Sequence, residues 1–285
     1  MCSKRSFARA ADRTRATTQN RCDNLFNLLS ENCYIMHEEN DASKGLGLQI
    51  RIILNEPLYE GNIGSTARTL KNFGYRDLVL VNPPHLGSEA RMMAQHARDL
   101  LERASICNSL EEAVAGSDLL IGTTGTRGET AGRHIRVPAY SPKQLREKLN
   151  GRAGSVSIIF GREDSGLPND EIATCDLLVS IPTSEEYPIM NLSHAVAVVA
   201  YELCDLAVGD LPFAGRRDLD LLYAHAEGLL HALNYPVHKR QKTALMLRRI
   251  LGRAELTARE VYTLRGVLKL IGYRIQSQLQ LQSEG

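Results

Sequence analysis

The sequence has no long apolar run. Its longest uninterrupted apolar stretch, Ala195 to Tyr201, is far shorter than the about 18 residues that a membrane-spanning helix needs. The first residues, Met1 to Gln19, are basic and rich in hydroxyl side chains, but they lack the apolar core of a secretory signal. These absences argue against a helical membrane protein and against export, and we expect a cytoplasmic protein.

Cysteine is also scarce, with six among 285 residues. No two of them form a CxxC pair, and no group of Cys and His residues has the spacing of zinc ligands. Disulfide scaffolds are typically short secreted chains with a much higher density of cysteine. We therefore expect neither a disulfide scaffold nor a bound metal ion.

The composition is that of a folded chain. Hydrophobic residues make up 43% and charged residues 24%, close to the averages for globular proteins. The length suits about one to two domains. Residues 1–48 are the exception, because they carry no sustained hydrophobic period and end in a polar run from Glu38 to Gly47. For residues 1–48 we expect a disordered N-terminal extension.

From residue 49 to residue 208, short apolar runs alternate with amphipathic stretches. This is the pattern of a parallel sheet with crossover helices, and runs rich in Val, Ile and Leu are typical of strands covered on both faces. The expected strands are Ile50–Leu54, Leu78–Asn82, Leu119–Thr123, Val156–Phe160 and Leu177–Ile181. The expected helices are Ile63–Phe73, Ser88–Leu101, Leu110–Ala115, Pro142–Leu149 and Asn191–Leu206. The sequence therefore predicts a doubly wound α/β domain.

A different pattern follows this domain. Residues 209–215 contain two glycines and a proline and are expected to form a linker. Residues 216–285 predict a small all-α domain, because apolar residues recur at helical spacing from Leu219 to Leu233 and two more helical stretches follow.

The helical tail concentrates positive charge. The net charge of the chain is only +1, yet the segment from Pro236 to Arg274 holds ten basic and two acidic residues. Such asymmetry favours a polyanionic partner. A solvated basic face without a ligand would give the same pattern, so charge alone leaves both interpretations open.

The loops after the expected strands carry the polar motifs. Ligands of open α/β sheets bind beyond the carboxyl ends of the strands. The four motifs there are GNIGSTAR at 61–68, GTTGT at 122–126, FGREDSGL at 160–167 and IPTSEEYPIMNLSHAV at 181–196. None contains the GxGxxG of dinucleotide sites or the GK[ST] of a P-loop. Taken singly, each could be an ordinary turn, and Asn191 could serve only as a helix N-cap.

Taken in this order and spacing, the four loops resemble the signature of the SPOUT superfamily of methyltransferases, in its TrmH-like branch, from Ile50 to about Leu203. The run EYPIMNLSHAV and a tail containing LRRILGRAELTAREVYTLRGVL are most similar to the TrmJ family of tRNA methyltransferases. The resemblance implies a parallel sheet whose last part forms a deep trefoil knot. It also implies a homodimer and S-adenosyl-L-methionine as the cofactor.

The resemblance implies that three loops bind this cofactor. Ile181, Ile189 and Met190 could supply the apolar slot that an adenine ring needs. The residues that match cofactor-binding positions of the family are Thr123, Thr124, Gly125, Gly161, Ile181, Ile189, Met190 and Asn191.

The resemblance further implies methyl transfer to a ribose 2′-hydroxyl, with Arg68, Asn62, Glu163 and Ser193 at the catalytic positions. Arginine is almost always protonated, so we expect Arg68 to stabilise negative charge that develops on the ribose oxygen. The proton acceptor stays open. Glu163 is the one carboxylate of the set, and we expect it to orient the loops.

The tail is expected to bind tRNA. The candidate phosphate-binding residues are Lys239, Arg240, Lys242, Arg248, Arg249 and Arg253. The alternative for these residues is a solubilising surface, or packing against the partner subunit of the dimer.

The third motif departs from the bacterial TrmJ pattern, in which two serines follow the tyrosine. Pro188 and Ile189 stand at those places here. This difference predicts the archaeal-like form of the family, with cytidine at position 32 of the anticodon loop as the target. The alternatives are an rRNA 2′-O-ribose methyltransferase of the same branch and a non-catalytic RNA-binding protein that keeps the fold.

Overall fold

The computed structural model describes residues 47–125 and 136–283. The N-terminal extension expected over residues 1–48 lies almost entirely outside the described residues. Within the described ranges, no helix is both long and apolar enough to cross a membrane.

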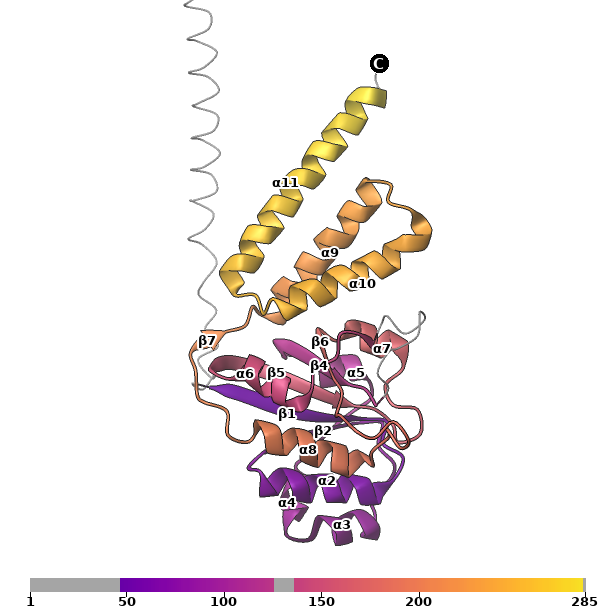
Figure 1. Cartoon of the computed structure of the whole chain (residues 1–285), viewed down its shortest axis with the longest axis vertical. Helices are drawn as coiled ribbons and strands as arrows, with labels where there is room; N and C mark the ends of the chain where they lie inside the picture. Colours follow the sequence, from indigo (N-terminus) through magenta and orange to yellow (C-terminus); the bar gives the residue numbers. More distant parts are fainter. Residues whose placement is uncertain (1–46, 126–135, 284–285) are drawn as a thin grey trace, which may run out of the picture. The chain divides into compact units, whose positions relative to one another are not determined.

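A parallel sheet forms the centre of the α/β region (Figure 1). Its strands are β1 (Leu48–Asn55), β2 (Asp77–Val81), β3 (Ser105–Cys107), β4 (Leu119–Thr123), β5 (Arg152–Phe160) and β6 (Leu177–Val179). They lie in the order β3-β2-β1-β5-β4-β6. All five expected strands are confirmed, whereas the three-residue strand β3 is too short to have left a pattern in the sequence. Because every pairing is parallel, the carboxyl ends of these strands share one edge.

Side chains of each central strand alternate between two apolar clusters, one on each face of the sheet. In β1, Ile52 and Leu54 belong to one cluster and Ile53 to the other. The helices of the α/β region are α2 (Glu60–Asn72), α3 (Ser88–Ala94), α4 (Arg98–Glu102), α5 (Leu110–Ala113), α6 (Pro142–Leu149), α7 (Asn169–Thr174) and α8 (Leu192–Leu203). Helices α2 and α8 contribute to the cluster of Ile52, and α5 and α7 contribute to that of Ile53. The doubly wound α/β prediction is confirmed.

Two helices differ from expectation. The single helix expected over Ser88–Leu101 is interrupted, because Gln95 has a φ of 51° and begins a 3₁₀ turn between α3 and α4. A left-handed residue cannot continue an α-helix. Helix α7 was not expected, since its six residues are too few to display a helical period.

Strand β6 has a neighbour on each side. It pairs with β4 on one side. On the other side the backbone N–H of Tyr140 donates to the Leu178 carbonyl at 2.8 Å, and the N–H of Ser180 donates to the Tyr140 carbonyl at 2.9 Å. The chain that leads from β4 to α6 therefore passes along the outer edge of β6.

The helical region contains α9 (Arg216–Ala232), α10 (Val237–Arg253) and α11 (Ala258–Ser283). Its own small core is built from Ala214, Leu219, Leu222, Tyr223 and Val261. The expected all-α region is thus observed. The segment expected to be a linker is partly packed, because the short strand β7 (Leu211–Pro212) pairs with the start of β5 and the Phe213 ring lies against the Arg152 guanidinium.

Candidate active site

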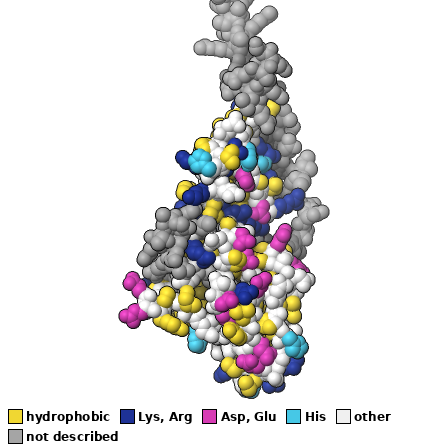
Figure 2. All heavy atoms as spheres, turned by 90° about the vertical axis from the view of Figure 1, so that its right-hand side faces the viewer, with side chains coloured by type: hydrophobic (Ala, Val, Ile, Leu, Met, Phe, Trp, Pro, Cys, Tyr) yellow, Lys and Arg dark blue, Asp and Glu magenta, His cyan; other side chains and the backbone are white. Residues whose placement is uncertain are grey.

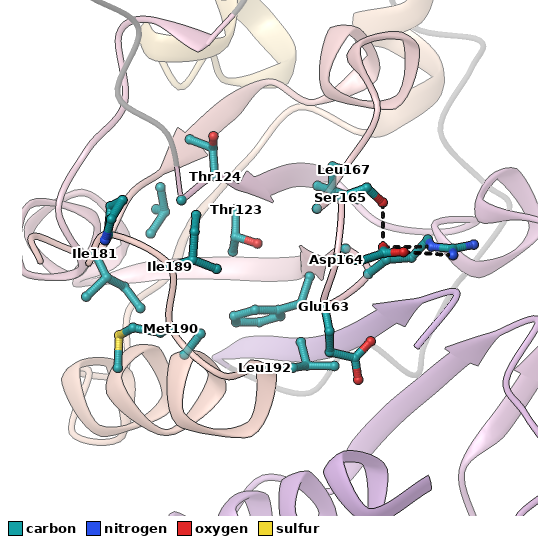
Figure 3. A pocket seen from close by; sticks show the side chains of 18 of the residues that line it. Thr123, Thr124, Glu163, Asp164, Ser165, Leu167, Ile181, Ile189, Met190 and Leu192 are labelled. Atoms are coloured by element: carbon teal, nitrogen blue, oxygen red, sulfur yellow. Dashed lines mark hydrogen bonds and ion pairs between the residues drawn. The ribbon is translucent and has the colours of Figure 1, made fainter. Parts of the chain in front are cut away.

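A cavity of about 300 Å³ opens at the carboxyl ends of β4, β5 and β6 (Figure 3). Each of the three strands runs directly into one of the expected motif loops. Seven residues expected to bind the cofactor line the cavity: Thr123, Thr124, Gly125, Gly161, Ile181, Ile189 and Met190. Asn191, the eighth, is absent from the lining and is the N-cap of α8, where its side chain accepts from the Ser193 N–H at 3.0 Å. Parallel strand topology thus brings together loops that are far apart in sequence.

The cavity has an apolar side and a polar side. In Figure 3, Ile181, Ile189 and Met190 lie on one side, opposite Asp164 and Ser165. Asp164 accepts from Arg162, and these hydrogen bonds hold the pKa of its carboxyl at about 2. Ligand sites of this kind, apolar with a few placed polar groups, suit a planar heterocycle that carries a charged tail.

The FGREDSGL motif forms a tight turn. A Cβ on Gly161 would lie 2.3 Å from the backbone carbonyl carbon of Gly166, so only glycine fits there. This close approach brings the backbone of the second motif over the end of β5. The turn therefore places Glu163 at the rim of the cavity.

Asn62, Glu163, Asn191 and Ser193 form one chain of hydrogen bonds. The Ser193 hydroxyl donates to Asn191 Oδ1 at 2.7 Å, and Asn191 Nδ2 donates to Asn62 Oδ1 at 3.0 Å. Asn62 Nδ2 then donates to Glu163 Oε1 at 2.8 Å. Each residue in this series therefore donates to the next one, and the series ends at the Glu163 carboxylate. Three of the four residues expected at catalytic positions, together with Asn191, are therefore one structural unit.

Glu163 is held by both of its oxygens. Oε1 accepts from Asn62, and Oε2 accepts from the backbone N–H of Leu58 at 2.8 Å. The carboxylate thus ties the turn after β5 to the loop after β1 and to the first turn of α2. Both hydrogen bonds join separate loops through this carboxylate, and the loop-orienting role of Glu163 stays a prediction.

Arg68 lies apart from this unit. It is on the exposed side of α2, does not line the cavity, and forms no hydrogen bond or ion pair with the residues that the structure describes. The structure therefore does not bring Arg68 to the cavity of its own chain.

Arg136 also lines the cavity, and sequence reasoning missed it. It follows no expected strand directly, so the rule that sites lie at strand ends gave no signal for it. Elsewhere, the residues within 47–125 and 136–283 include no cluster of three or more His, Cys, Asp or Glu side chains that could hold a metal ion.

The six basic residues of the tail fall into two groups. Lys239 and Lys242 are exposed, and Arg240 and Arg253 are half-buried. Figure 2 shows Lys and Arg side chains together with His side chains on the upper part of the face it presents. Arg240 already donates to the Tyr235 carbonyl at 2.7 Å, within the helical region itself. In the part of the chain that the structure describes, none of these four forms a hydrogen bond or ion pair with α7, and contact with phosphates stays a prediction for them.

The other two, Arg248 and Arg249, have partners inside the protein, which corrects the expectation that they bind phosphates. The Arg249 guanidinium is buried and donates to the carbonyls of Cys175 at 2.9 Å and Ile172 at 2.7 Å. Arg248 donates to the Thr174 carbonyl at 3.0 Å. The last carbonyls of a helix lack partners within the helix and favour cations, so both arginines cap the C-terminal end of α7.

Asp176 adds a second contact between the helical region and the α/β region, this time with α9. Its buried carboxylate accepts from the Arg216 guanidinium at 2.8 Å, from the Tyr223 hydroxyl at 3.1 Å and from the Leu120 N–H at 3.0 Å. Burial, together with this carboxylate, raises the pKa of Tyr223. The helical region is therefore held to the start of β6 by buried polar contacts.

Family models match both regions of the chain. The model of the SpoU rRNA methylase family matches residues 49–201, which contain all of the cavity-lining residues. The model of the tRNA methyltransferase TrmJ, C-terminal domain, matches residues 217–280.

Curated relatives extend over both regions. The tRNA (cytidine-2′-O-)-methyltransferase TrmJ of Methanocaldococcus jannaschii is 40% identical over 230 residues, covering 78% of this chain and 99% of the relative. The tRNA (cytidine/uridine-2′-O-)-methyltransferase TrmJ of Sodalis glossinidius is 34% identical over 237 residues, covering 78% of this chain and 91% of the relative.

A solved structure of a TrmJ protein is also similar to this chain. The crystal structure of TrmJ from Z. mobilis ZM4 superposes with a TM-score of 0.63 at 31% identity, covering 78% of this chain and 98% of that chain. A family match over more than half of the chain, with relatives covered over nearly their whole length, shows that the chain belongs to the SpoU methylase family and, within it, to the TrmJ methyltransferases.

Proposed function

We propose that this protein transfers a methyl group from S-adenosyl-L-methionine to a ribose 2′-hydroxyl of tRNA. The observation that carries the proposal is the cavity at the ends of β4, β5 and β6, with the Asn62–Glu163 hydrogen bond at its rim. Membership of the TrmJ methyltransferases supports the reaction, because its curated relatives are named tRNA 2′-O-methyltransferases.

The lining fits the proposed cofactor. Ile181, Ile189 and Met190 offer an apolar wall for the adenine, and the backbone at Thr124, Gly125 and Gly161 lies within the same cavity. When bound, S-adenosyl-L-methionine supplies an electrophilic methyl group on a sulfonium centre. The loops of this chain would hold that methyl group toward the rim, where Glu163 and Asn62 lie.

Positioning supplies the largest share of the rate in this proposal. Fixing the ribose oxygen in line with the methyl group can contribute an effective molarity on the order of 10⁵ M or more. The hydrogen-bonded unit from Ser193 to Glu163 preorganises the rim for this purpose. The 2′-oxygen gains the methyl group and loses its proton, and the acceptor of that proton is left unassigned.

Arg68 enters the proposal through a homodimer. An exposed arginine on α2 that makes no contact with its own cavity fits a role across a subunit interface. There its guanidinium would bind a phosphate next to the reacting ribose and stabilise charge on the 2′-oxygen.

The helical region is proposed to bind the tRNA backbone with Lys239, Arg240, Lys242 and Arg253. Arg248 and Arg249 are left out, because their guanidinium groups are used against α7. Electrostatic binding of this kind weakens steeply as salt rises.

The proposed target base is cytidine at position 32. The Methanocaldococcus jannaschii relative is named for cytidine alone, and the relative with lower identity is named for cytidine or uridine. Pro188 and Ile189 remove two hydroxyl groups from the cavity loop, and both residues line the cavity. A loop without these hydroxyls supports a narrower choice of base.

We include in the proposal a knotted chain and a cytoplasmic location. Strand β6 lies between β4 and Tyr140, which pairs with its outer edge. This arrangement supports the trefoil knot implied by the family resemblance, although knots are rare in proteins. Because the proposed substrate is tRNA, we propose a cytoplasmic location.

The test is transfer of labelled methyl from S-adenosyl-L-methionine to unmodified tRNA transcripts, followed by nuclease mapping. We expect a 2′-O-methyl mark at cytidine 32 that is lost with Arg68→Ala, and a weaker mark when uridine replaces the cytidine. Equal methylation of both bases would refute the base assignment. Methylation of ribosomal RNA alone would identify ribosomal RNA, and not tRNA, as the substrate. Failure to bind the cofactor would favour a non-catalytic RNA-binding protein.

A further inference from the structure

Arg136 occupies a central place in the cavity wall. It lies between β4 and α6, far in sequence from the second and third motifs, and its side chain lines the cavity. Arg136 belongs to none of the four motifs and has no part in the proposed methyl transfer.

The guanidinium of Arg136 joins three parts of the cavity. Nη1 donates to the Thr124 hydroxyl at 3.1 Å, just beyond the end of β4. Nη2 donates to the Leu167 carbonyl at 3.0 Å, at the end of the FGREDSGL turn, and to Asn169 Oδ1 at 3.2 Å, at the first residue of α7. One planar group thus links the loop after β4 to the turn after β5.

Strand β6, whose following loop also lines the cavity, is connected to Thr124 as well. Thr124 is buried, and its backbone N–H donates to the Val179 carbonyl, the last residue of β6, at 2.9 Å. Thr124 is therefore held from one side by β6 and from the other by Arg136. All three strands whose loops line the cavity are connected through these two residues.

The shape of arginine is what makes this link. A guanidinium presents several N–H donors in a rigid plane and can reach separate acceptors at once, whereas a lysine ammonium is a single point on a flexible stem. A lysine at position 136 could keep a contact with one of the three acceptors. A methionine of similar length would keep the packing and lose all three.

The contacts of Arg136 are separate from the Glu163 unit. The Thr124 hydroxyl, the Leu167 carbonyl and Asn169 Oδ1 all lie outside the series of hydrogen bonds from Ser193 to Glu163. Loss of Arg136 would therefore loosen the walls of the cavity and leave the rim at Asn62 and Glu163 in place.

We propose that Arg136 is a positioning residue for cofactor binding: it sets the spacing of the loop after β4 and the turn after β5, and so determines affinity for S-adenosyl-L-methionine. This inference rests on the proposed function. Preorganised walls reduce the ordering that binding must impose, so their loss appears in affinity.

The test measures binding and turnover of the full chain for Arg136→Met, Arg136→Lys and a matched control, Arg146→Met. The Arg146 guanidinium pairs with exposed Asp205 outside the cavity. With S-adenosyl-L-homocysteine in a calorimeter, we expect Kd to rise roughly tenfold or more for Arg136→Met, with a smaller rise for Arg136→Lys. Arg146→Met should match the wild type.

Kinetics then separate positioning from general damage. We expect the KM for S-adenosyl-L-methionine to rise with Kd, while kcat at saturating cofactor stays within about twofold of the wild type. The inference is overturned if Arg136→Met binds as tightly as the wild type, if Arg146→Met weakens binding equally, or if kcat falls with KM unchanged. If Arg136→Met fails to fold, Arg136→Lys decides by the same criteria. A wild type that binds no cofactor would instead overturn the proposed function.

Discussion

The α/β region and the helical region differ in what became of the residues that the sequence singled out. In the α/β region, Asn62 and Asn191, separated by 129 positions, meet in a hydrogen bond, and Asn62 also donates to Glu163, which lines the cavity. In the helical region, two basic residues of the same helix have opposite environments, because Lys242 is exposed and Arg249 is buried. The first set was chosen by motif and strand order, the second by charge. Motifs that follow strands carry information on position, whereas a count of charges does not.

The strongest test of the first half of this comparison is Asn62→Ala. The substitution leaves Glu163 Oε1 and Asn191 Nδ2 each without the partner it has in the folded chain. We expect kcat/KM to fall by about 10² to 10³, the range seen when a preorganised polar group is removed from an active site. The measurement is methyl transfer to tRNA.

The matched control is Asn72→Ala, at the exposed last residue of the same helix. It should leave kcat/KM within about twofold of the wild type. A similar loss in both variants would mean that any such change in α2 lowers kcat/KM. The loss in Asn62→Ala could then not be assigned to the hydrogen bonds with Glu163 and Asn191.

The second half of the comparison is tested by Arg249→Ala beside Lys242→Ala. Removing Arg249 takes this donor from the Cys175 carbonyl and leaves the Ile172 carbonyl with one donor fewer, so we expect a loss of about 1–3 kcal/mol in the free energy of unfolding. Lys242 is exposed, and its removal should change stability by less than about 0.5 kcal/mol. Urea unfolding measures both.

Binding provides the converse readout. Lys242→Ala is expected to weaken tRNA binding without affecting stability. If Arg249→Ala proved neutral in urea and weakened tRNA binding as Lys242→Ala does, Arg249 would bind phosphates and would not serve to hold α10 to α7.

Periodicity places Arg249 on the packed face of α10, although it does not separate Arg249 from exposed Lys242, which lies seven residues earlier on the same face. Leu245, Arg249 and Gly252 follow one another at intervals of four and three residues, so they share one face of α10. That face carries the buried residues of the helix. A basic residue that is buried on the packed face of an amphipathic helix is expected to find an internal partner.

Two short elements and the contacts of Arg136 could not be predicted from the sequence. Strand β3 and helix α7 are too short to show a period. Arg136 belongs to no strand end, and only the folded chain brings it to Thr124 and Leu167. The strands and the cavity loops were predictable because parallel topology fixes which loop ends share an edge, while contacts made by isolated loop residues depend on the packing itself.

The two regions also respond differently to the same change of glycine to alanine. In α2, a Cβ on Gly64 would lie 2.1 Å from the Ala90 carbonyl oxygen, so Gly64→Ala must push α3 away. We expect a loss of about 1–3 kcal/mol in stability. Gly228 in α9 has open space around its Cβ position, and Gly228→Ala should stabilise by about 0.5–1 kcal/mol through helix propensity. Thermal unfolding distinguishes the two signs, and a stable Gly64→Ala would contradict the contact between α2 and α3.

The smallest expected effect is a pH dependence in the α/β region. Burial raises the pKa of Glu171 above its ordinary value of 4.5, against hydrogen bonds from Asn55 that lower it and the nearby negative charges of Asp170 and Glu56, which raise it further. A carboxyl whose pKa is raised on folding binds its proton more tightly in the folded chain. Its contribution to stability is therefore full below the unfolded pKa and is lost as pH rises through the folded pKa.

Glu171→Gln removes this titration and keeps an oxygen that can accept from Asn55 Nδ2. Above the raised pKa, the variant should be slightly more stable than the wild type. This advantage should shrink as pH falls through the raised pKa and should be gone below about 4.5, the unfolded pKa. Urea unfolding of both proteins across that range measures the difference. A difference that is independent of pH would mean that Glu171 ionises as freely in the folded chain as in the unfolded one, and that the pairing with Asn55 at the end of β1 compensates fully for its burial.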